Sequence, residues 1–87
     1  MKLTGKCKEE FEEWLQYLTW EQYPISMQYG VYVDFFDSVG IRISMNQFNK
    51  EYWFDIYPQA EDCECLKTRT EARIAAIEKA NEIYNNI

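Results

Sequence analysis

Carboxylates and thiols are the side chains of this sequence that could do chemistry, because its 87 residues include no histidine. Asp34 and Asp55 are expected on either side of Ser44 on one sheet face. Two strand spacings would set them roughly 10 Å apart, near or above the upper limit for an inverting glycosidase pair. A flat sheet face does not exclude water. We therefore interpret the two aspartates as charges that oppose aggregation, and we predict no enzyme and no catalytic residues.

The three cysteines raise the question of a metal or redox centre. Cys63 and Cys65 form the one closely spaced pair, and Cys7 could act as a third ligand; the alternative is two free thiols in an acidic loop. Structural zinc usually takes four Cys or His ligands, which this chain does not provide, so we predict no metal and no cofactor. An odd number of cysteines and an N-terminus unlike a signal peptide suit the cytoplasm.

The composition is that of one globular domain over residues 1–87, with 47% hydrophobic and 17% aromatic residues. A formal net charge of -6 repels phosphate backbones and anionic lipid, so we expect neither nucleic acid nor membrane as a partner. No apolar run approaches the ~20 residues of a membrane-spanning helix. Fifteen aromatic residues, the sum of 3 Trp, 7 Tyr and 5 Phe, exceed what so small a core needs, so some should lie at the surface.

Three segments, residues 31–36, 41–46 and 52–57, alternate apolar and polar side chains with a period of two, which predicts half-buried β-strands. The triplet Ser38-Val39-Gly40 fits a hairpin loop that ends in a left-handed glycine. Asn49-Lys50 fits a second, two-residue turn. The resulting registers pair Phe35 with Ile43, Val33 with Met45, Met45 with Phe54, and Ile43 with Ile56.

These registers divide the side chains of the predicted sheet between two faces. The inner face holds Val31, Val33, Phe35, Ile41, Ile43, Met45, Tyr52, Phe54 and Ile56. The outer face has three rows across the strands, which are Phe36, Arg42 and Tyr57, then Asp34, Ser44 and Asp55, then Tyr32, Asn46 and Trp53. Four large aromatic residues would then bracket two aspartates on the outside.

A helix is predicted on each side of these strands. The first runs from about Gly5 to about Trp20, with Thr4 as its cap, and the second follows a capping box formed by Thr68 and Glu71. The apolar stripe of the first helix is Cys7, Phe11, Trp14, Leu15 and Leu18. That of the second is Ala72, Ala76, Ile77, Ala80, Ile83, Tyr84 and Ile87, with Asn81, Asn85 and Asn86 suggesting a frayed end. The predicted fold class is α+β, with order α-β-β-β-α, a three-stranded antiparallel meander and both helices on one sheet face.

Residues 68–73, Thr-Arg-Thr-Glu-Ala-Arg, with the alanines that follow and the predicted element order, resemble the double-stranded RNA-binding domain. In that family, basic residues here hold phosphates across the major groove, and Arg69 and Arg73 match two of them. Thr70 replaces a third, and the acidic first helix departs further, which argues against RNA binding. The pattern of residues 68–80 is also similar to the C-termini of small uncharacterised phage and mobile-element proteins, a likeness that implies no particular chemistry.

The outer aromatic face is the feature on which we base the expected function. We predict a non-enzymatic protein-interaction module that binds protein, either another protein or, most simply, a second copy in a homodimer. The predicted interface is Tyr32, Phe36, Arg42, Trp53, Tyr57, Asp34 and Asp55. The simpler alternative is cross-strand stabilisation, with Arg42 stacked between aromatic rings. A second hypothesis is an acidic inhibitor that mimics nucleic-acid charge through Glu9, Glu12 and Glu13. RNA binding remains a third.

Overall fold

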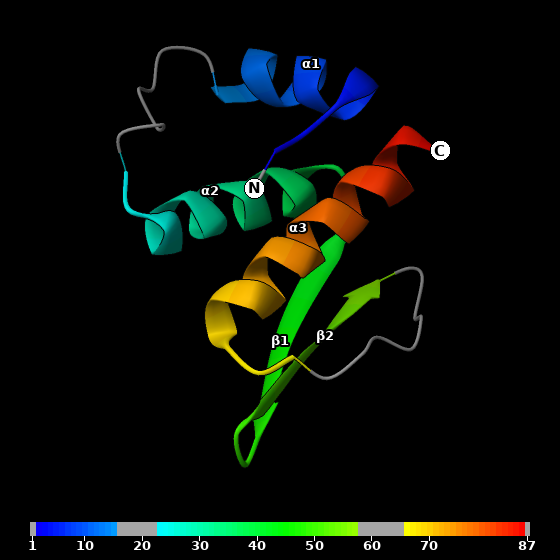
Figure 1. The fold of residues 1–87 in the computed structure, drawn as a ribbon. Helices are drawn as coiled ribbons and strands as arrows, with labels where there is room; N and C mark the ends of the chain where they lie inside the picture. Colours follow the sequence, from blue (N-terminus) through cyan, green and yellow to red (C-terminus); the bar gives the residue numbers. More distant parts are fainter. Residues whose placement is uncertain (1, 16–22, 58–65, 87) are drawn as a thin grey trace.

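The computed structural model describes residues 2–15, 23–57 and 66–86, and its elements follow the order helix, helix, strand, strand, helix (Figure 1). They are α1 Gly5–Leu15, α2 Ile25–Ser38, β1 Arg42–Phe48, β2 Glu51–Tyr57 and α3 Arg69–Asn85. The chain is of mixed α+β type. The predicted three-stranded meander is wrong, because the described residues form one two-stranded sheet and residues 31–36 lie inside α2.

The α2 segment satisfies two periodicities at once, and tertiary packing selects the helical one. Val31, Val33 and Phe35 alternate as in a strand, but Tyr29, Tyr32 and Phe36 recur at spacings of three and four, as on one side of a helix. Tyr32 and Phe36 are buried, so this helical side faces the core. Strand propensity depends on context, and here the core decides against it.

The end of α2 explains the misassigned hairpin loop. The N–H of Ile41 donates to the carbonyl of Phe36 (2.8 Å) and the N–H of Gly40 to the carbonyl of Asp37 (3.1 Å). Gly40 has φ +87°. This pair of bonds around a left-handed glycine is the Schellman ending of an α-helix. The predicted left-handed glycine is present, but it ends a helix instead of turning a hairpin.

The second predicted hairpin is confirmed, with its register. β1 and β2 pair antiparallel around the Asn49-Lys50 turn, with Met45 opposite Phe54 and Ile43 opposite Ile56. Asn49 takes a left-handed φ of +56°, which asparagine tolerates better than most residues. The predicted pairings Arg42 with Tyr57, Ser44 with Asp55, and Asn46 with Trp53 are also present.

The helices form layers above one side of this hairpin (Figure 1). α3 packs on the hairpin and on α2, while α1 packs on α2 and α3, on the side away from the strands. The prediction that both flanking helices cover the sheet is therefore wrong for α1. The aromatic rings of Phe11, Tyr32 and Phe35 connect α1 to α2, with centroids 4.9 Å apart for Phe11 and Tyr32.

The two predicted helical stripes supply most of the core. In α3, the buried stripe is Ala72, Ala76, Ile77, Ala80, Ile83 and Tyr84. In α1, Cys7, Phe11 and Leu15 are buried, whereas Trp14 is 43% exposed. Leu18 and Ile87 lie outside the described residues, as does the predicted extension of the first helix from residue 16 to residue 20.

Two asparagines of α3 hold the start of α1. The N–H of Thr4 donates to Asn81 Oδ1 (2.9 Å), and Asn81 Nδ2 donates to Thr4 Oγ1 (3.0 Å). The N–H of Cys7 donates to Asn85 Oδ1 (2.8 Å), and Asn85 Nδ2 donates to the carbonyl of Thr4 (2.9 Å). These side chains satisfy N–H groups that a helix start leaves without intrahelical partners. Asn81 and Asn85 are therefore caps from a distant segment, and the predicted fraying is wrong for them.

Gly5 is required at this junction for two reasons. Its φ is +58°, a left-handed conformation that costs most side chains strain. An added Cβ would also lie 3.3 Å from Asn85 Oδ1. The residue that follows Thr4 therefore has to be small and conformationally permissive for the asparagines to reach the backbone.

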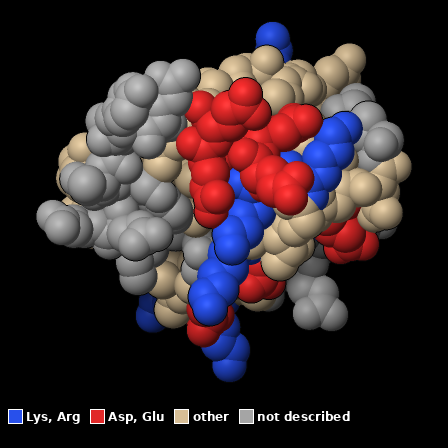
Figure 2. Space-filling model, turned by 90° about the horizontal axis from the view of Figure 1, so that it is seen from above, with Lys and Arg blue, Asp and Glu red and all other residues tan. Residues whose placement is uncertain are grey.

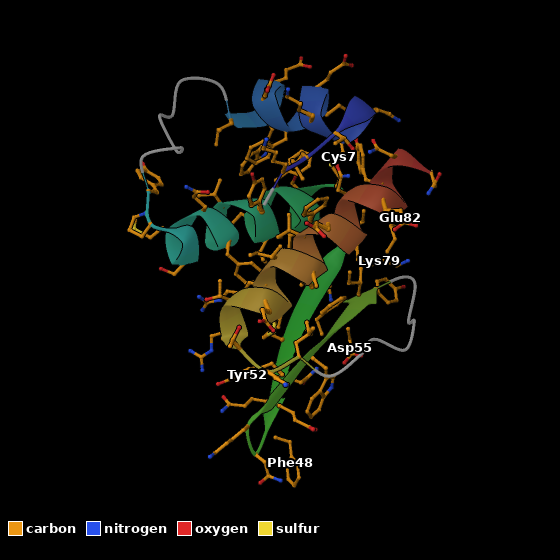
Figure 3. The ribbon with its side chains drawn as sticks, viewed as in Figure 1. Cys7, Phe48, Tyr52, Asp55, Lys79 and Glu82 are labelled. Carbon is orange, nitrogen blue, oxygen red and sulfur yellow. The ribbon has the colours of Figure 1, made fainter. Side chains whose placement is uncertain are left out.

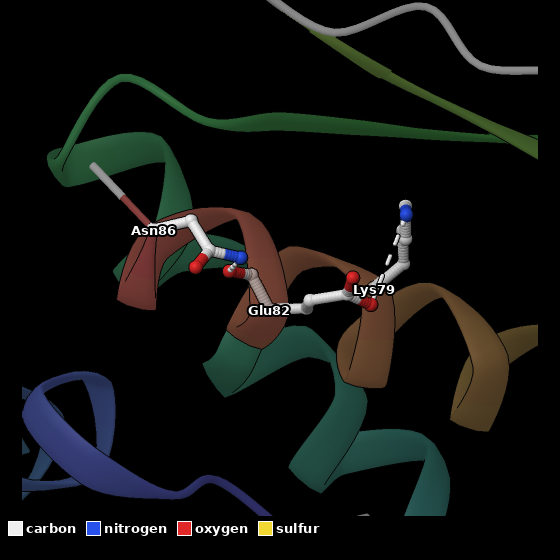
Figure 4. Close-up of polar contacts among 3 residues, drawn as sticks. All are labelled: Lys79, Glu82 and Asn86. Carbon is white, nitrogen blue, oxygen red and sulfur yellow. Dashed lines mark hydrogen bonds and ion pairs between the residues drawn. The ribbon is translucent and has the colours of Figure 1, made fainter.

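Side-chain caps mark both ends of α3. At the start, Thr68 Oγ1 accepts a hydrogen bond from the N–H of Glu71 (3.1 Å), as the predicted capping box requires of its threonine. At the other end, Asn86 Nδ2 donates to the carbonyl of Glu82 (3.0 Å), and Lys79 Nζ lies 3.8 Å from a Glu82 carboxylate oxygen (Figure 4). Local sequence signals thus set the limits of this helix.

Candidate functional site

The predicted four-aromatic surface does not form. Tyr32 and Phe36 are 2% and 0% exposed, because both point from α2 into the core. Asp34 is exposed but also lies on α2, so it does not flank Ser44, and the predicted row with Asp55 is wrong. The remaining predicted interface residues, Arg42, Trp53, Asp55 and Tyr57, stay together on the hairpin.

These residues belong to one surface, which we call the hairpin outer face. Parity along the two strands assigns to it Arg42, Ser44, Asn46, Phe48, Glu51, Trp53, Asp55 and Tyr57. The opposite face is the one that packs on the helices, with Phe54 and Ile56 buried and Ile43 and Met45 against the core. The lower part of the hairpin extends beyond the helices, with Phe48 at its tip (Figure 3).

Two large aromatic side chains of the hairpin outer face are strongly exposed. Phe48 is 66% exposed near the turn and Tyr57 is 68% exposed at the other end of the hairpin, with the half-buried Trp53 between them. Sequence reasoning missed Phe48, because it ended the strand at Asn46. Continuing the same alternation by one step would have placed Phe48 on this face.

Polar groups are interspersed with these rings. Arg42 lies directly across the ladder from Tyr57, and both are exposed. Asn46 Nδ2 donates to an Asp55 carboxylate oxygen (3.0 Å). A wide, open hollow at the tip is lined by Phe48, Asn49, Lys50 and Glu51. Bulk water reaches it, so the tip suits surface binding better than enclosed chemistry.

The two arginines that matched the RNA-binding motif each lie over an aromatic ring. The Arg69 guanidinium is 5.8 Å from the Tyr52 ring centroid, and its Nη2 donates to Gln47 Oε1 (3.4 Å). The Arg73 guanidinium is 5.4 Å from the Tyr29 centroid. These cation–π contacts link α3 to β2 and to α2. RNA binding itself stays a prediction.

The predicted acidic surface lies on α1. Glu9, Glu12 and Glu13 are all exposed, and acidic side chains gather on the face of the molecule that carries α1 (Figure 2). Lysine and arginine side chains lie directly beside them in the same view, and the exposed Lys6 and Lys8 come from α1 itself. The surface is therefore of mixed charge, and mimicry of nucleic acid stays a prediction.

Cys7 is the one cysteine among the described residues, and it is fully buried between α1 and its neighbours. Burial, with a smaller contribution from the Glu10 carboxylate, raises the pKa of this thiol from 9.0 to about 12. A thiol needs its thiolate form to act as a nucleophile or metal ligand. Cys7 is therefore a packing residue at neutral pH. Cys63 and Cys65 lie outside the described residues.

This thiol predicts an alkaline loss of stability. Between pH 9 and pH 12 the unfolded chain ionises Cys7 while the folded protein keeps the proton, so the free energy of unfolding falls by about 1.4 kcal/mol per pH unit. We therefore expect the stability difference between wild type and Cys7→Ala to shrink across this range in denaturant titrations. Burial also raises the pKa of Tyr29, against a lowering by Arg73, but both proteins contain Tyr29, so its contribution cancels in the difference. A difference independent of pH would contradict the assignment.

No group of three Cys, Asp or Glu side chains in residues 2–15, 23–57 and 66–86 is arranged to hold a metal ion. None of the helices in that part of the chain combines the length and apolar character that crossing a bilayer requires. Comparison of the sequence with protein-family models gives no match, and comparisons with curated proteins and with solved structures give none either. The hairpin outer face, with its exposed aromatic rings, is the candidate functional site of the described residues.

Proposed function

We propose that this protein is an interaction module in which the hairpin outer face binds a second copy of the same chain. The observation that carries the proposal is the exposure of Phe48 and Tyr57, about two thirds each, at opposite ends of one face. Exposed aromatic rings among a few polar groups are typical of binding hot spots. A ring that remains in water forgoes the stabilisation that burial would give it.

The same face also carries groups that suit its own aromatic rings. Arg42 is an exposed cation, and a guanidinium binds well to the faces of tyrosine and phenylalanine rings. In a symmetric pair, the cation of each copy can meet a ring of the other, so the surface is self-complementary about a two-fold axis. This pairing supports a homodimer over an unrelated partner.

The size of the hairpin outer face sets the expected affinity. Seven residue pairs at ~3.4 Å per residue give a strip about 24 Å long and two strands wide. Such a strip is small compared with the ~800 Å² per partner of a standard interface. We therefore expect weak, micromolar association that requires concentrated samples.

Sedimentation of lysine variants tests the proposal. We expect wild type to form dimers at tens to hundreds of micromolar, and Phe48→Lys and Tyr57→Lys to weaken dimerisation at least tenfold, because each replaces a ring on the interface with a charge. Met27→Lys is the matched control, since Met27 is 54% exposed but lies on α2. A monomeric wild type over this concentration range, or an equal effect of all three variants, would refute the proposal.

A further inference from the structure

The strand β1 has a second backbone edge, facing away from β2, that no described residue pairs with. Among the described residues, β1 pairs with β2 alone. The two-residue turn makes Phe48 and Glu51 a hydrogen-bonded pair. The backbone N–H and C=O groups of even-numbered β1 residues therefore bond to β2, and those of odd-numbered residues point away from β2. The N–H and C=O groups of Ile43, Met45 and Gln47 therefore line an open edge.

The opposite edge of the hairpin confirms this alternation. On β2, the even-numbered Tyr52 should point its backbone groups away from β1. Its N–H donates to the carbonyl of Leu66 (2.9 Å), and the N–H of Leu66 donates back to its carbonyl (2.8 Å). The edge of β2 therefore accepts an added strand segment at Tyr52, whereas no described residue does the same for β1.

We propose that two copies join through their β1 edges, antiparallel about a two-fold axis at Met45, to form a continuous four-stranded sheet. This inference rests on the proposed self-association and specifies its geometry. The hairpin outer faces of the two copies lie side by side as one continuous face, in which Phe48 meets the partner directly and Tyr57 acts through Arg42 of its own chain. With Met45 opposite Met45 of the partner, all seven residues of each strand find a partner residue. Ile43 then exchanges both backbone hydrogen bonds with the partner's Gln47, and the reverse pair does the same.

This register also explains the two exposed rings. It sets Phe48 of one copy opposite Arg42 of the other, and Arg42 already lies opposite Tyr57 across its own hairpin. Each guanidinium would then have an aromatic ring on both sides, in a row that crosses all four strands. Arg42 is the one charged residue of β1, and the two-fold axis keeps its two copies about 20 Å apart. The pairing therefore brings no like charges together.

The β1 edge is most accessible at its lower end. The hairpin turn extends beyond α2 and α3 (Figure 1), and both Gln47 and Phe48, the last residues of β1 before the turn, are exposed. A long edge strand with few charges is a template for pairing with another chain. A two-stranded sheet is also marginal by itself, so widening it to four strands stabilises each copy.

Gln47 allows a test that separates backbone from side chain. Gln47→Pro removes the edge N–H without touching the ladder to β2, where proline is tolerated with its nitrogen towards solvent. Gln47→Ala removes the same side chain and keeps the N–H. We expect Gln47→Ala to dimerise like wild type and Gln47→Pro to dimerise at least tenfold more weakly, with circular dichroism showing that both are folded.

Two further measurements fix the geometry. Amide hydrogen exchange at Met45 and Gln47 should slow as protein concentration rises, while Ser44 and Asn46, already bonded to β2, should change less. Phe48→Glu should still dimerise, because the new carboxylate faces Arg42 of the partner, in contrast to Phe48→Lys.

Edge pairing and self-association fail in different ways. A wild type that stays monomeric overturns both proposals. The edge geometry alone is overturned if wild type and Gln47→Pro both dimerise and the amides of β1 show no protection that depends on concentration. The hairpin outer face would then remain as the contact.

Discussion

Phe36→Ala is expected to lower the free energy of unfolding by ~3–5 kcal/mol, the cost of removing a fully buried aromatic side chain and leaving a cavity. Phe36 is 0% exposed and packs edge-on against Phe35, with ring centroids 5.3 Å apart. It projects from α2, which packs against α1, α3 and β1. Urea unfolding followed by circular dichroism measures the loss.

An aromatic residue of the hairpin provides the matched comparison. Tyr57 is 68% exposed, so Tyr57→Ala should change stability by no more than about 0.5 kcal/mol in dilute samples. The strand interpretation of residues 31–36 instead puts Phe36 and Tyr57 on the same outer row. Equal effects of the two substitutions would support that interpretation and contradict α2.

Asn81→Ala and Asn85→Ala are each expected to lower the free energy of unfolding by about 1–3 kcal/mol, because each leaves a backbone N–H at the start of α1 without its hydrogen-bond acceptor. Thr4 loses its acceptor in the first variant and Cys7 in the second. α1 has 11 residues, too few to be stable as an isolated helix. We therefore expect faster amide exchange throughout α1 and a lower denaturation midpoint.

Asn86→Ala is the control for this pair. Asn86 Nδ2 donates within its own helix, to the carbonyl of Glu82, so its loss should cost less than either of the others and leave exchange in α1 unchanged. A cost for Asn86→Ala as large as that of Asn81→Ala would mean that asparagine replacement disturbs α3 in general. Unchanged exchange in α1 after both substitutions would show that the asparagines do not hold it.

The candidate site could be predicted in part, because strand alternation is a local property. Once β1 and β2 are recognised and the Asn49-Lys50 turn fixes the register, parity alone places Arg42, Trp53, Asp55 and Tyr57 on one face. The same parity argument fails for Tyr32 and Phe36, because the spacing of apolar side chains in residues 31–36 fits both a strand and a helix. The prediction therefore put two buried rings on the aromatic surface and left out Phe48, which belongs to it.

The sequence by itself determined the hairpin, its register and α3, because each is specified by neighbours in the chain: a two-residue turn between alternating strands, and Thr68 ahead of an alanine-rich stripe. Only the tertiary structure decided between strand and helix for residues 31–36. It also decided the role of the asparagines that reach Thr4 from 77 and 81 residues away in sequence. Burial against α1 and α3 settles the first, and hydrogen bonds between opposite ends of the chain settle the second, so neither could be decided from a short stretch of sequence.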